Sequence, residues 1–339
     1  MSKRHLTKQQ RRRILENQRR AQSSTDRPGS PESQTTTDGL GPEQTGRITA
    51  CYGNRVLVES DEHKGEVHRC YLRANLPSIV TGDRVTWQHG ASNGVVVAIS
   101  PRSSELCRPD NRGKLRPVAA NIDCIAVVIA PFPEPHTNLI DRYLVAAERQ
   151  GIQPILILNK SDLIAKDQQK TLVSLMDDYR KLGYYCLQVS AFTGSGIDEL
   201  TDYLSTRTSV FVGQSGVGKS SLLNRIAPEA EAAVGALSQS AAKGTHTTTT
   251  AQLFHLPGGG EVIDSPGIRE FGLWHLEPDA IAEGFVEFRA FLGHCRFRDC
   301  RHQGEPGCAL RQAIASGSIS ATRFSSYQQI VQSLESDQQ

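Results

Sequence analysis

The sequence contains no apolar run that reaches the roughly 18–20 residues a helix needs to cross a bilayer. Its N-terminus also lacks the apolar core of a secretory signal. These two absences argue against an integral membrane protein and against a secreted one. We therefore expect a protein that has no membrane partner.

Cysteine is scarce for a chain of this length. Eight cysteines are spread over 339 residues, five of them singly and three close together near the C-terminus. A secreted domain held together by disulfides has a denser pattern of paired cysteines. The sequence therefore favours a reducing compartment, and we expect a cytoplasmic protein.

The chain also has almost no net charge, with 38 Lys and Arg residues against 36 Asp and Glu residues. The charge is unevenly distributed, because residues 1–20 contain eight basic residues and one acidic residue. A basic arm of this kind attracts phosphate groups, and its affinity falls as the salt concentration rises. We expect it to contact nucleic acid. The alternatives are a solvated tail without a specific target and a transit peptide, which is also rich in arginine.

Composition separates an N-terminal arm from a first folded domain. Residues 21–45 are rich in Ser, Thr, Pro, Gly and Gln, so residues 1–45 are expected to form a basic arm and a flexible linker. Residues 46–102 contain five short β-like runs separated by turn signals. This spacing predicts a small β-barrel of the oligonucleotide-binding (OB) type; the alternative is another small barrel or sandwich with a structural role.

Residues 103–277 change to an alternation of strands and helices. Apolar runs predict buried strands at 122–130 and 154–160, and further strands are expected at 184–191 and 208–213. Helical spacing occurs at 138–151, 166–182 and 197–204. The alternation predicts an α/β domain with a largely parallel sheet. Residues 278–339 are expected to form a mostly helical domain, interrupted by a cluster of cysteine and histidine.

The stretch GQSGVGKS follows one of these strands and precedes the helical SLLNRI. Phosphate-binding loops occur in this context, because glycine N–H groups surround phosphate oxygens and a helix N-terminus adds a favourable dipole. We expect Lys219 to reach the β- and γ-phosphates and the Ser220 hydroxyl to bind Mg²⁺. A purely structural turn is the alternative. The candidate nucleotide-binding residues here are Gly213, Gln214, Ser215, Gly216, Val217, Gly218, Lys219, Ser220 and Ser221.

A second strand ends in the tetrapeptide NKSD at 159–162. The Asp162 carboxylate can accept hydrogen bonds from both N1–H and the N2 amine of guanine, a donor pair that adenine lacks. We expect Asn159 to brace the neighbouring loops and the stem of Lys160 to cover the base. Four residues also recur by chance, which is the alternative for this motif taken alone.

Ser190 and Ala191 end the next predicted strand and match the backbone element that GTPases place against the guanine oxygen. Further along, EVIDSPG predicts a strand that ends in Asp264, which suits an outer-sphere Mg²⁺ position, followed by Gly267, whose N–H suits the γ-phosphate. These motifs and the phosphate loop together indicate a GTPase that binds GTP and GDP with Mg²⁺.

The segment 243–254 lies between the phosphate loop and Asp264 and is polar and dense in threonine. A threonine here can supply a second Mg²⁺ ligand when the γ-phosphate orders the loop. Thr248 and Thr249 are the two candidates, and the choice between them stays open. The alternative is a loop in which the threonines are only low-complexity sequence.

The parts of a GTPase are therefore present, but the base-reading motif precedes the phosphate loop. Such an order is a circular permutation. It is physically permissible because the termini of a domain often lie close together at its surface, so that joining and reopening them preserves the sheet.

The C-terminal cluster contains three cysteines and one histidine within a short stretch. Three thiolates and one imidazole form a closed tetrahedral set, which predicts one structural Zn²⁺. His294 is a rival ligand, and the alternatives to a metal are buried free thiols or a disulfide. The candidate ligands are Cys295, Cys300, His302 and Cys308.

With these motifs in place, residues 46–330 resemble the small ribosomal subunit biogenesis GTPases of the RsgA (YjeQ) family. The run GTHTTTTAQLFHLPGGGEVIDSPGIREFGLWHLEP carries the resemblance most strongly. It implies an OB barrel, a circularly permuted GTPase domain and a zinc domain. It also implies binding to the small ribosomal subunit late in its assembly and GTP hydrolysis that the subunit stimulates.

The resemblance also suggests a catalytic residue. Ile268 stands where Ras-type enzymes carry the glutamine that orients the attacking water. The family assigns this role to a histidine in the pattern Gly-Arg-His-Thr-Thr-Thr, which matches residues 244–249 and implies His246. Thr245 replaces the family arginine, so the contribution of that arginine is in doubt here.

We therefore expect a monomeric GTPase that acts in late maturation of the small ribosomal subunit and binds its rRNA through the barrel and the zinc domain. One alternative is a nucleotide-switched RNA-binding scaffold in which hydrolysis is incidental. A second is a translation or tRNA-modification GTPase, which a different particle would stimulate.

Overall fold

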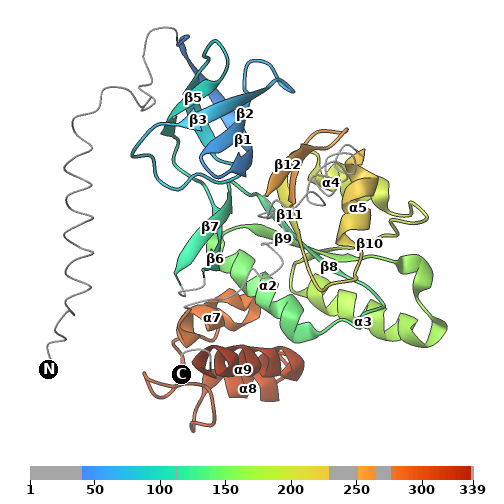
Figure 1. Cartoon of the computed structure of the whole chain (residues 1–339). Helices are drawn as coiled ribbons and strands as arrows, with labels where there is room; N and C mark the ends of the chain where they lie inside the picture. The colour runs from blue at the N-terminus through green and yellow to red at the C-terminus, as the bar shows by residue number, and fades with distance from the viewer. Residues whose placement is uncertain (1–39, 111–113, 229–250, 265–275, 337–339) are drawn as a thin grey trace, which may run out of the picture. The chain divides into compact units, whose positions relative to one another are not determined.

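The computed structural model describes residues 40–110, 114–228, 251–264 and 276–336, and Figure 1 labels its helices and strands. Across these ranges, no helix combines the length and the apolar character of a membrane span. The first strand begins at Glu43, slightly before the predicted start of the barrel.

Five strands close into a barrel in which β3 and β5 are parallel and the other neighbours are antiparallel. The order around the barrel is β1-β2-β3-β5-β4, and β4 pairs again with β1. Ile48, Val58 and Trp87 are fully buried at its centre. The predicted OB-type barrel is thus confirmed as a closed five-stranded barrel. Its strands are β1 (Glu43–Tyr52), β2 (Arg55–Ser60), β3 (Val67–Leu72), β4 (Arg84–Gln88) and β5 (Gly94–Ile99).

The central domain contains a sheet with the strand order β10-β9-β8-β11-β13-β12. All neighbours are parallel except β12, which runs antiparallel to β13. The largely parallel α/β sheet is therefore confirmed. Its strands are β8 (Cys124–Ile129), β9 (Gln153–Leu158), β10 (Tyr185–Gln188), β11 (Thr208–Val212), β12 (Gln252–His255) and β13 (Glu261–Asp264).

Strand β12 corrects one sequence expectation. Segment 243–254 was expected to be a single polar loop, but its last three residues begin this strand. Leu253 and Phe254 are buried on opposite faces of the sheet, which two adjacent apolar residues of a short strand can achieve. The apolar pair follows a polar run of threonines, so the sequence analysis did not predict a strand there.

Helices cover both faces of the central sheet, which explains why β8 is apolar at every position. Ile125 and Val127 join the core under α2 and α3, whereas Ala126 and Val128 join the core under α4 and α5. Helix α2 ends at Gly151, whose φ of 66° is left-handed, as its position after the helical pattern indicates. The four helices are α2 (Thr137–Gln150), α3 (Lys166–Lys181), α4 (Ile197–Leu204) and α5 (Lys219–Ile226).

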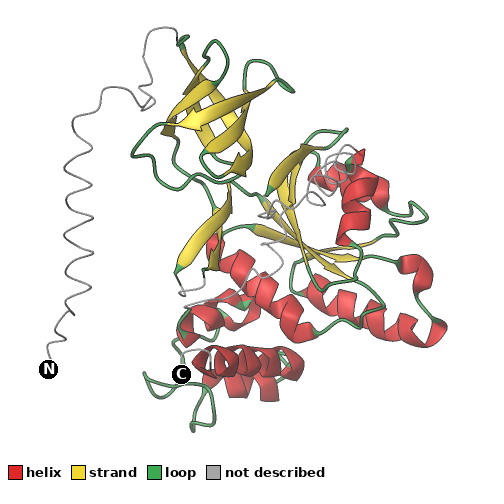
Figure 2. Cartoon of the chain, viewed as in Figure 1, coloured by secondary structure: helices red, strands yellow, loops and turns green. Residues whose placement is uncertain are grey.

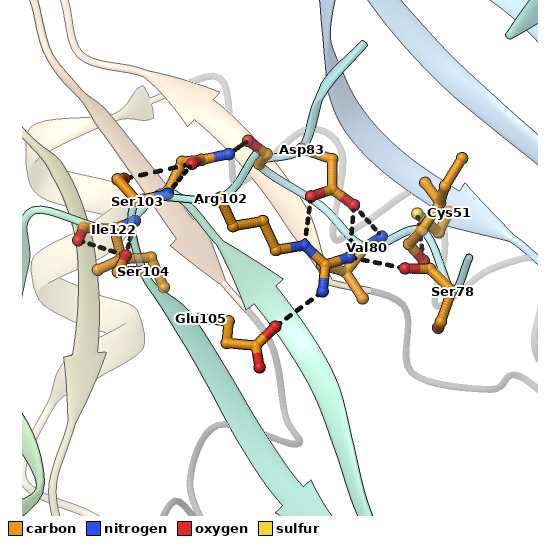
Figure 3. A network of polar contacts seen from close by, with 12 residues as sticks. Cys51, Ser78, Val80, Asp83, Arg102, Ser103, Ser104, Glu105 and Ile122 are labelled. Carbon is orange, nitrogen blue, oxygen red and sulfur yellow. Dashed lines mark hydrogen bonds and ion pairs between the residues drawn. The ribbon is translucent and has the colours of Figure 1, made fainter. Parts of the chain in front are cut away.

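A fully buried carboxylate, Asp83, organises the connection that leaves the barrel (Figure 3). Arg102 donates to both of its oxygens, at 2.7 and 2.9 Å, and to Glu105 at 2.8 Å. The Val80 N–H donates to the same carboxylate at 2.8 Å. Glu105 begins a hairpin of β6 (Glu105–Pro109) and β7 (Leu115–Ala120), which the sequence analysis did not predict.

The described C-terminal residues contain helices and loops and no strand (Figure 2). They share one hydrophobic core with α2, through side chains such as Phe285, Leu310 and Tyr327. The mostly helical C-terminal domain is thus confirmed. Its elements are α7 (Pro278–Gly284), the 3₁₀ turn η4 (Val286–Phe288), α8 (Ala309–Ala315) and α9 (Ala321–Ser336).

A buried ion network joins α9 to α2. Arg323 donates to Asp141 at 2.5 Å and to both oxygens of Glu287, at 2.7 and 3.0 Å. Tyr179 donates to the same oxygen of Asp141 at 2.6 Å. Burial raises the pKa of Asp141, and the Arg323 charge opposes that shift. The carboxylate therefore depends on Arg323 for its charged state.

We predict that Arg323→Met lowers the free energy of unfolding by about 3–5 kcal/mol, because it leaves buried carboxylates without their cation. Urea denaturation followed by the helical circular dichroism signal measures the change. Arg149→Met is the matched control: Arg149 also links α2 to α7, but its pair with Glu283 is exposed and should contribute less than about 1 kcal/mol. Equal effects of the two substitutions would contradict the assigned role of the network.

Candidate functional site

The sheet topology brings the predicted motifs to one edge. Strands β9, β10, β11 and β13 are parallel, so their carboxyl ends lie together. Asn159, Ser190 and Gly213 follow the first three of these strands, and Asp264 is the last residue of β13. Successive strands β8, β9 and β10 extend the sheet in one direction, whereas β11 returns to the other side of β8. A ligand site is expected at the carboxyl end of such a reversal.

The phosphate loop requires glycine for steric reasons at two positions. Gly213 has a φ of 135°, and a Cβ there would lie 2.2 Å from the Val128 carbonyl oxygen. Gly218 has a φ of 93°, and a Cβ there would lie 2.4 Å from Nδ2 of Asn159. Any side chain at either position would clash with these atoms, so glycine allows the loop to approach its neighbours closely.

Helix α5 starts at Lys219, directly after this loop. The Lys219 ammonium donates to the carbonyl oxygens of Gly213 and Gln214 at 2.7 and 2.6 Å, which holds it against the loop. Val217 is 1% exposed and packs in the core, so it can offer a ligand only its backbone. Ser215, Gly216 and Ser221 are exposed beside it.

Asn159 connects three loops of the site. Its side chain is 1% exposed. Nδ2 donates to the Val217 carbonyl oxygen at 2.9 Å, and Oδ1 accepts from the Ala191 N–H at 3.2 Å. These are the bracing contacts expected from the sequence, and they span residues 58 and 32 positions away along the chain. A short polar side chain thus determines how the base-reading and phosphate loops face each other.

Lys160 and Asp162 are both held in defined positions. The Lys160 ammonium donates to the carbonyl oxygens of Phe132, at 3.2 Å, and of Gly216. Asp162 is exposed, and its Oδ1 accepts from the Ser190 hydroxyl at 2.5 Å. A carboxylate that is exposed but oriented in this way can accept hydrogen bonds from a ligand.

One neighbour of this site was missed by the sequence analysis. Residues 130–135 follow β8, the strand beside β11, and Phe132 is 57% exposed there. Pro133 lies 3.7 Å from the position of a Cβ on Gly216. The available signal was the Pro-rich run APFPEP directly after a buried strand, because loops at the carboxyl end of a parallel sheet tend to line its site.

A hollow at the end of β13 contains the groups expected to face Mg²⁺. Hydroxyl and carboxylate oxygens of the kind that Ser220 and Asp264 carry are the ligands Mg²⁺ prefers, so this donor set fits the ion. The hollow is lined by Phe211, Lys219, Ser220, Leu223, Val262, Ile263 and Asp264. The other predicted residues of this half of the site, His246, Thr248, Thr249 and Gly267, lie outside the described residues.

The four predicted metal ligands come together in the C-terminal domain. Their ligand atoms all lie within 4.8 Å of one another, and this cluster could hold a metal ion. His302 Nδ1 lies 3.6 Å from the sulfurs of Cys295 and Cys300 and 3.3 Å from that of Cys308. His294 is exposed and outside the cluster, and all eight cysteines are free, so neither the rival ligand nor a disulfide is supported.

Burial changes the acid–base properties of this cluster. Burial lowers the pKa of His302, which favours the neutral imidazole that metals bind. Burial also raises the pKa of Cys300 to about 12 without a metal. The backbone N–H of Ala309, at the start of α8, donates to the Cys295 sulfur at 3.3 Å.

We predict that Asn159→Ala weakens GDP binding by about tenfold or more, because it removes a buried donor and a buried acceptor that connect the loops. Fluorescence titration with a labelled GDP measures the affinity. Asn138→Ala is the matched control, since its amide also donates to a backbone carbonyl, that of Ser326, but away from the site. If both variants bind GDP like the unmodified protein, Asn159 does not organise the loops.

Comparisons with known proteins agree with this geometry. The family model described as "RsgA GTPase" matches residues 99–274. The small ribosomal subunit biogenesis GTPase RsgA of Ectopseudomonas mendocina is 55% identical over 342 residues, which cover 99% of each chain. The protein of the same name from Pseudomonas aeruginosa is 56% identical over 336 residues, which cover 98% of each chain.

Two solved structures are also similar to this chain. YjeQ from Thermotoga maritima is 34% identical, with a TM-score of 0.72, and the match covers 86% of this chain and 99% of that one. YloQ, described as a circularly permuted GTPase, is 28% identical, with a TM-score of 0.69, and the match covers 90% of this chain and 98% of that one.

Proposed function

This chain belongs to the RsgA GTPase family, and from that premise we propose that it hydrolyses GTP to GDP and phosphate during late maturation of the small ribosomal subunit. The observation that carries the proposal is the buried amide of Asn159, which connects the guanine-reading loops to the phosphate loop. A site whose ligand carries both a base and phosphates needs such a connection between its loops.

The roles of the site residues follow from their chemistry. Asp162 accepts from N1–H and N2 of guanine, the stem of Lys160 covers the base, and the backbone element at Ser190 and Ala191 lies against the guanine oxygen. The amides of the phosphate loop and Lys219 bind the phosphates. We assign phosphate binding to the whole loop, residues 213–221.

Hydrolysis requires a water molecule to attack the γ-phosphorus while the bond to the β–γ bridging oxygen breaks. Ser220, with Thr248 or Thr249, would hold Mg²⁺, and Asp264 would hold it through water. The ion would supply positive charge that neutralises the phosphates. The Gly267 N–H contacts the γ-phosphate. His246 orients the attacking water, a role that rests on the match of residues 244–249 to the family pattern.

We assign the metal of the C-terminal cluster as one structural Zn²⁺. With Zn–S near 2.3 Å and Zn–N near 2.0–2.1 Å, a tetrahedral site separates sulfur and nitrogen by about 3.5 Å. The three sulfur-to-nitrogen distances of 3.3–3.6 Å support this assignment. Three thiolates and one imidazole also leave no open position, as expected of a structural ion.

Cys300→Ser should reduce bound zinc from about one ion per chain to a small fraction, because a four-ligand structural site loses a thiolate. Elemental analysis of the purified protein measures the stoichiometry. Cys107→Ser, which changes a half-exposed thiol in β6, should retain the ion. Retention of a full equivalent by both variants would show that the cluster is not the zinc site.

The partner is the small ribosomal subunit, bound through its rRNA. Arg296, Arg298 and Arg301 are exposed around the metal cluster, and arginine suits phosphate contacts. The barrel of residues 46–102 and the basic arm within residues 1–45 would add further contacts. The GTPase domain spans residues 103–277 and the zinc domain residues 278–339. We place the protein in the cytoplasm, where that subunit is assembled, and we expect it to be a monomer.

The test is GTP turnover with and without purified small subunits across a salt series. Alone, the protein should turn over slowly, on the order of 10⁻⁴ to 10⁻² per second. Small subunits should stimulate it, the stimulation should fall as salt rises, and large subunits should have no effect. Stimulation by large subunits or by tRNA instead would favour a translation or tRNA-modification GTPase.

His246→Ala separates the enzyme from a nucleotide-switched scaffold. We expect this substitution to abolish the stimulated turnover while GTP binding and subunit binding persist, because only the attacking water loses its partner. An unchanged rate would remove the water-orienting role from His246. A protein that binds both ligands and never turns over faster would support the scaffold.

A further inference from the structure

The barrel is continuous with the GTPase sheet. Ala50 of β1 pairs with Gln252 of β12, so the barrel and the central strands form one eleven-stranded sheet. Strand β12, which pairs with the barrel, forms a hairpin with β13, and β13 ends in Asp264. A contact made by the barrel can therefore influence the Mg²⁺ side of the nucleotide site.

A buried arginine of the barrel binds the first residue of β13. Arg47 in β1 is 7% exposed and forms an ion pair with Glu261. Its guanidinium also donates to the Thr208 hydroxyl of β11 at 3.0 Å, and that hydroxyl donates to Glu261 at 2.8 Å. The arginine thus holds β11 and β13 together at the ends opposite the nucleotide site.

The hairpin has a second polar contact with the barrel. His255, at the end of β12, lies 2.7 Å from Glu59 of β2. Its other ring nitrogen lies 3.8 Å from Glu261. Glu59 is oriented in turn by the Gly65 N–H, which donates to it at 2.7 Å. Residues from two barrel strands therefore contact the hairpin beside its turn, where His255 pairs with Glu261.

A barrel loop contacts the same hairpin nearer the nucleotide. The Thr81 hydroxyl donates to the carbonyl oxygen of Ala251, the residue before β12, at 2.8 Å. The adjacent Gly82 lies so close that a Cβ would meet Ile263, the neighbour of Asp264, at 3.1 Å. Arg102 donates to both oxygens of the next residue, Asp83 (Figure 3), and these hydrogen bonds hold the loop in position.

We propose that the barrel is a positioning element for Mg²⁺ binding: Arg47 and Thr81 hold the β12–β13 hairpin so that Asp264 faces Ser220. Strands β12 and β13 contain four residues each, and a two-stranded hairpin of that length is marginal by itself. Pairing with β11 supports one side of the hairpin, and the barrel supports the other. The inference rests on the proposed binding of a Mg²⁺–guanine nucleotide.

The test compares GDP affinity in EDTA with GDP affinity in saturating Mg²⁺, for the full-length chain. In EDTA only the base-reading and phosphate loops contribute, so Arg47→Met and Thr81→Val should bind like the unmodified protein, within about twofold. The gain in affinity on adding Mg²⁺ should fall about five- to tenfold in both variants, the loss that one buried hydrogen bond produces. Arg47→Lys, which keeps the charge, should restore part of the gain.

Two controls separate this inference from the proposed function. Asp162→Asn should weaken binding in EDTA and in Mg²⁺ alike, and a protein that binds no GDP at all contradicts the proposed function itself. Arg323→Met removes a buried arginine elsewhere and should leave the Mg²⁺ gain unchanged even though it destabilises the fold. Thr81→Val is nearly isosteric and keeps the test valid if Arg47→Met does not fold.

The inference is overturned if both barrel variants retain the full Mg²⁺ gain. It is also overturned if they lose affinity equally in EDTA and in Mg²⁺, because the barrel would then support the whole domain rather than the end that carries Asp264. A selective loss of the Mg²⁺ gain is the only result that assigns positioning to Arg47 and Thr81.

Discussion

The strands that carry the nucleotide site all run in one direction, and the rest of the structure depends on this parallel pairing. Parallel strands present their carboxyl ends at one edge, so loops that are distant in sequence meet there. Asn159, Ala191 and Val217 come into contact for this reason. The order of the motifs along the chain is then immaterial, because the position of each strand is set by its neighbours in the sheet. A permuted GTPase can therefore keep the geometry of its site.

Two buried arginines attach the flanking domains to this sheet. Arg47 connects the barrel to β13, and Arg323 connects the C-terminal helices to α2. Arg47 is paired with Glu261, and Arg323 is paired with Asp141 and Glu287. Buried ion pairs contribute little net stability, since desolvation offsets their attraction, but a missing partner is costly. They favour one arrangement of the domains over others.

Most of the secondary structure could be predicted from local patterns. The five barrel strands, the run of β8 and the helix that ends at Gly151 all have strong periodic or turn signals. The β6–β7 hairpin and β12 were missed because their sequences are short and mixed in polarity. Strand β12 also pairs with Ala50, which is far away in the chain, and local periodicity contains no information about such a partner.

By itself, the sequence determined the chemical motifs of the chain: the stretch GQSGVGKS after a strand, the tetrapeptide NKSD after another, and a set of three thiols and an imidazole at the spacing of a metal site. These motifs are recognisable because each is a local arrangement that steric and electronic requirements restrict to few residue types. Only the tertiary structure decided which domain supports which part of the site. Arg47 and Glu261 are 214 residues apart, and each looks like an ordinary surface charge in its own segment. Their pairing arises from the packing of two domains, where burial makes a lone charge unfavourable and so selects the contact.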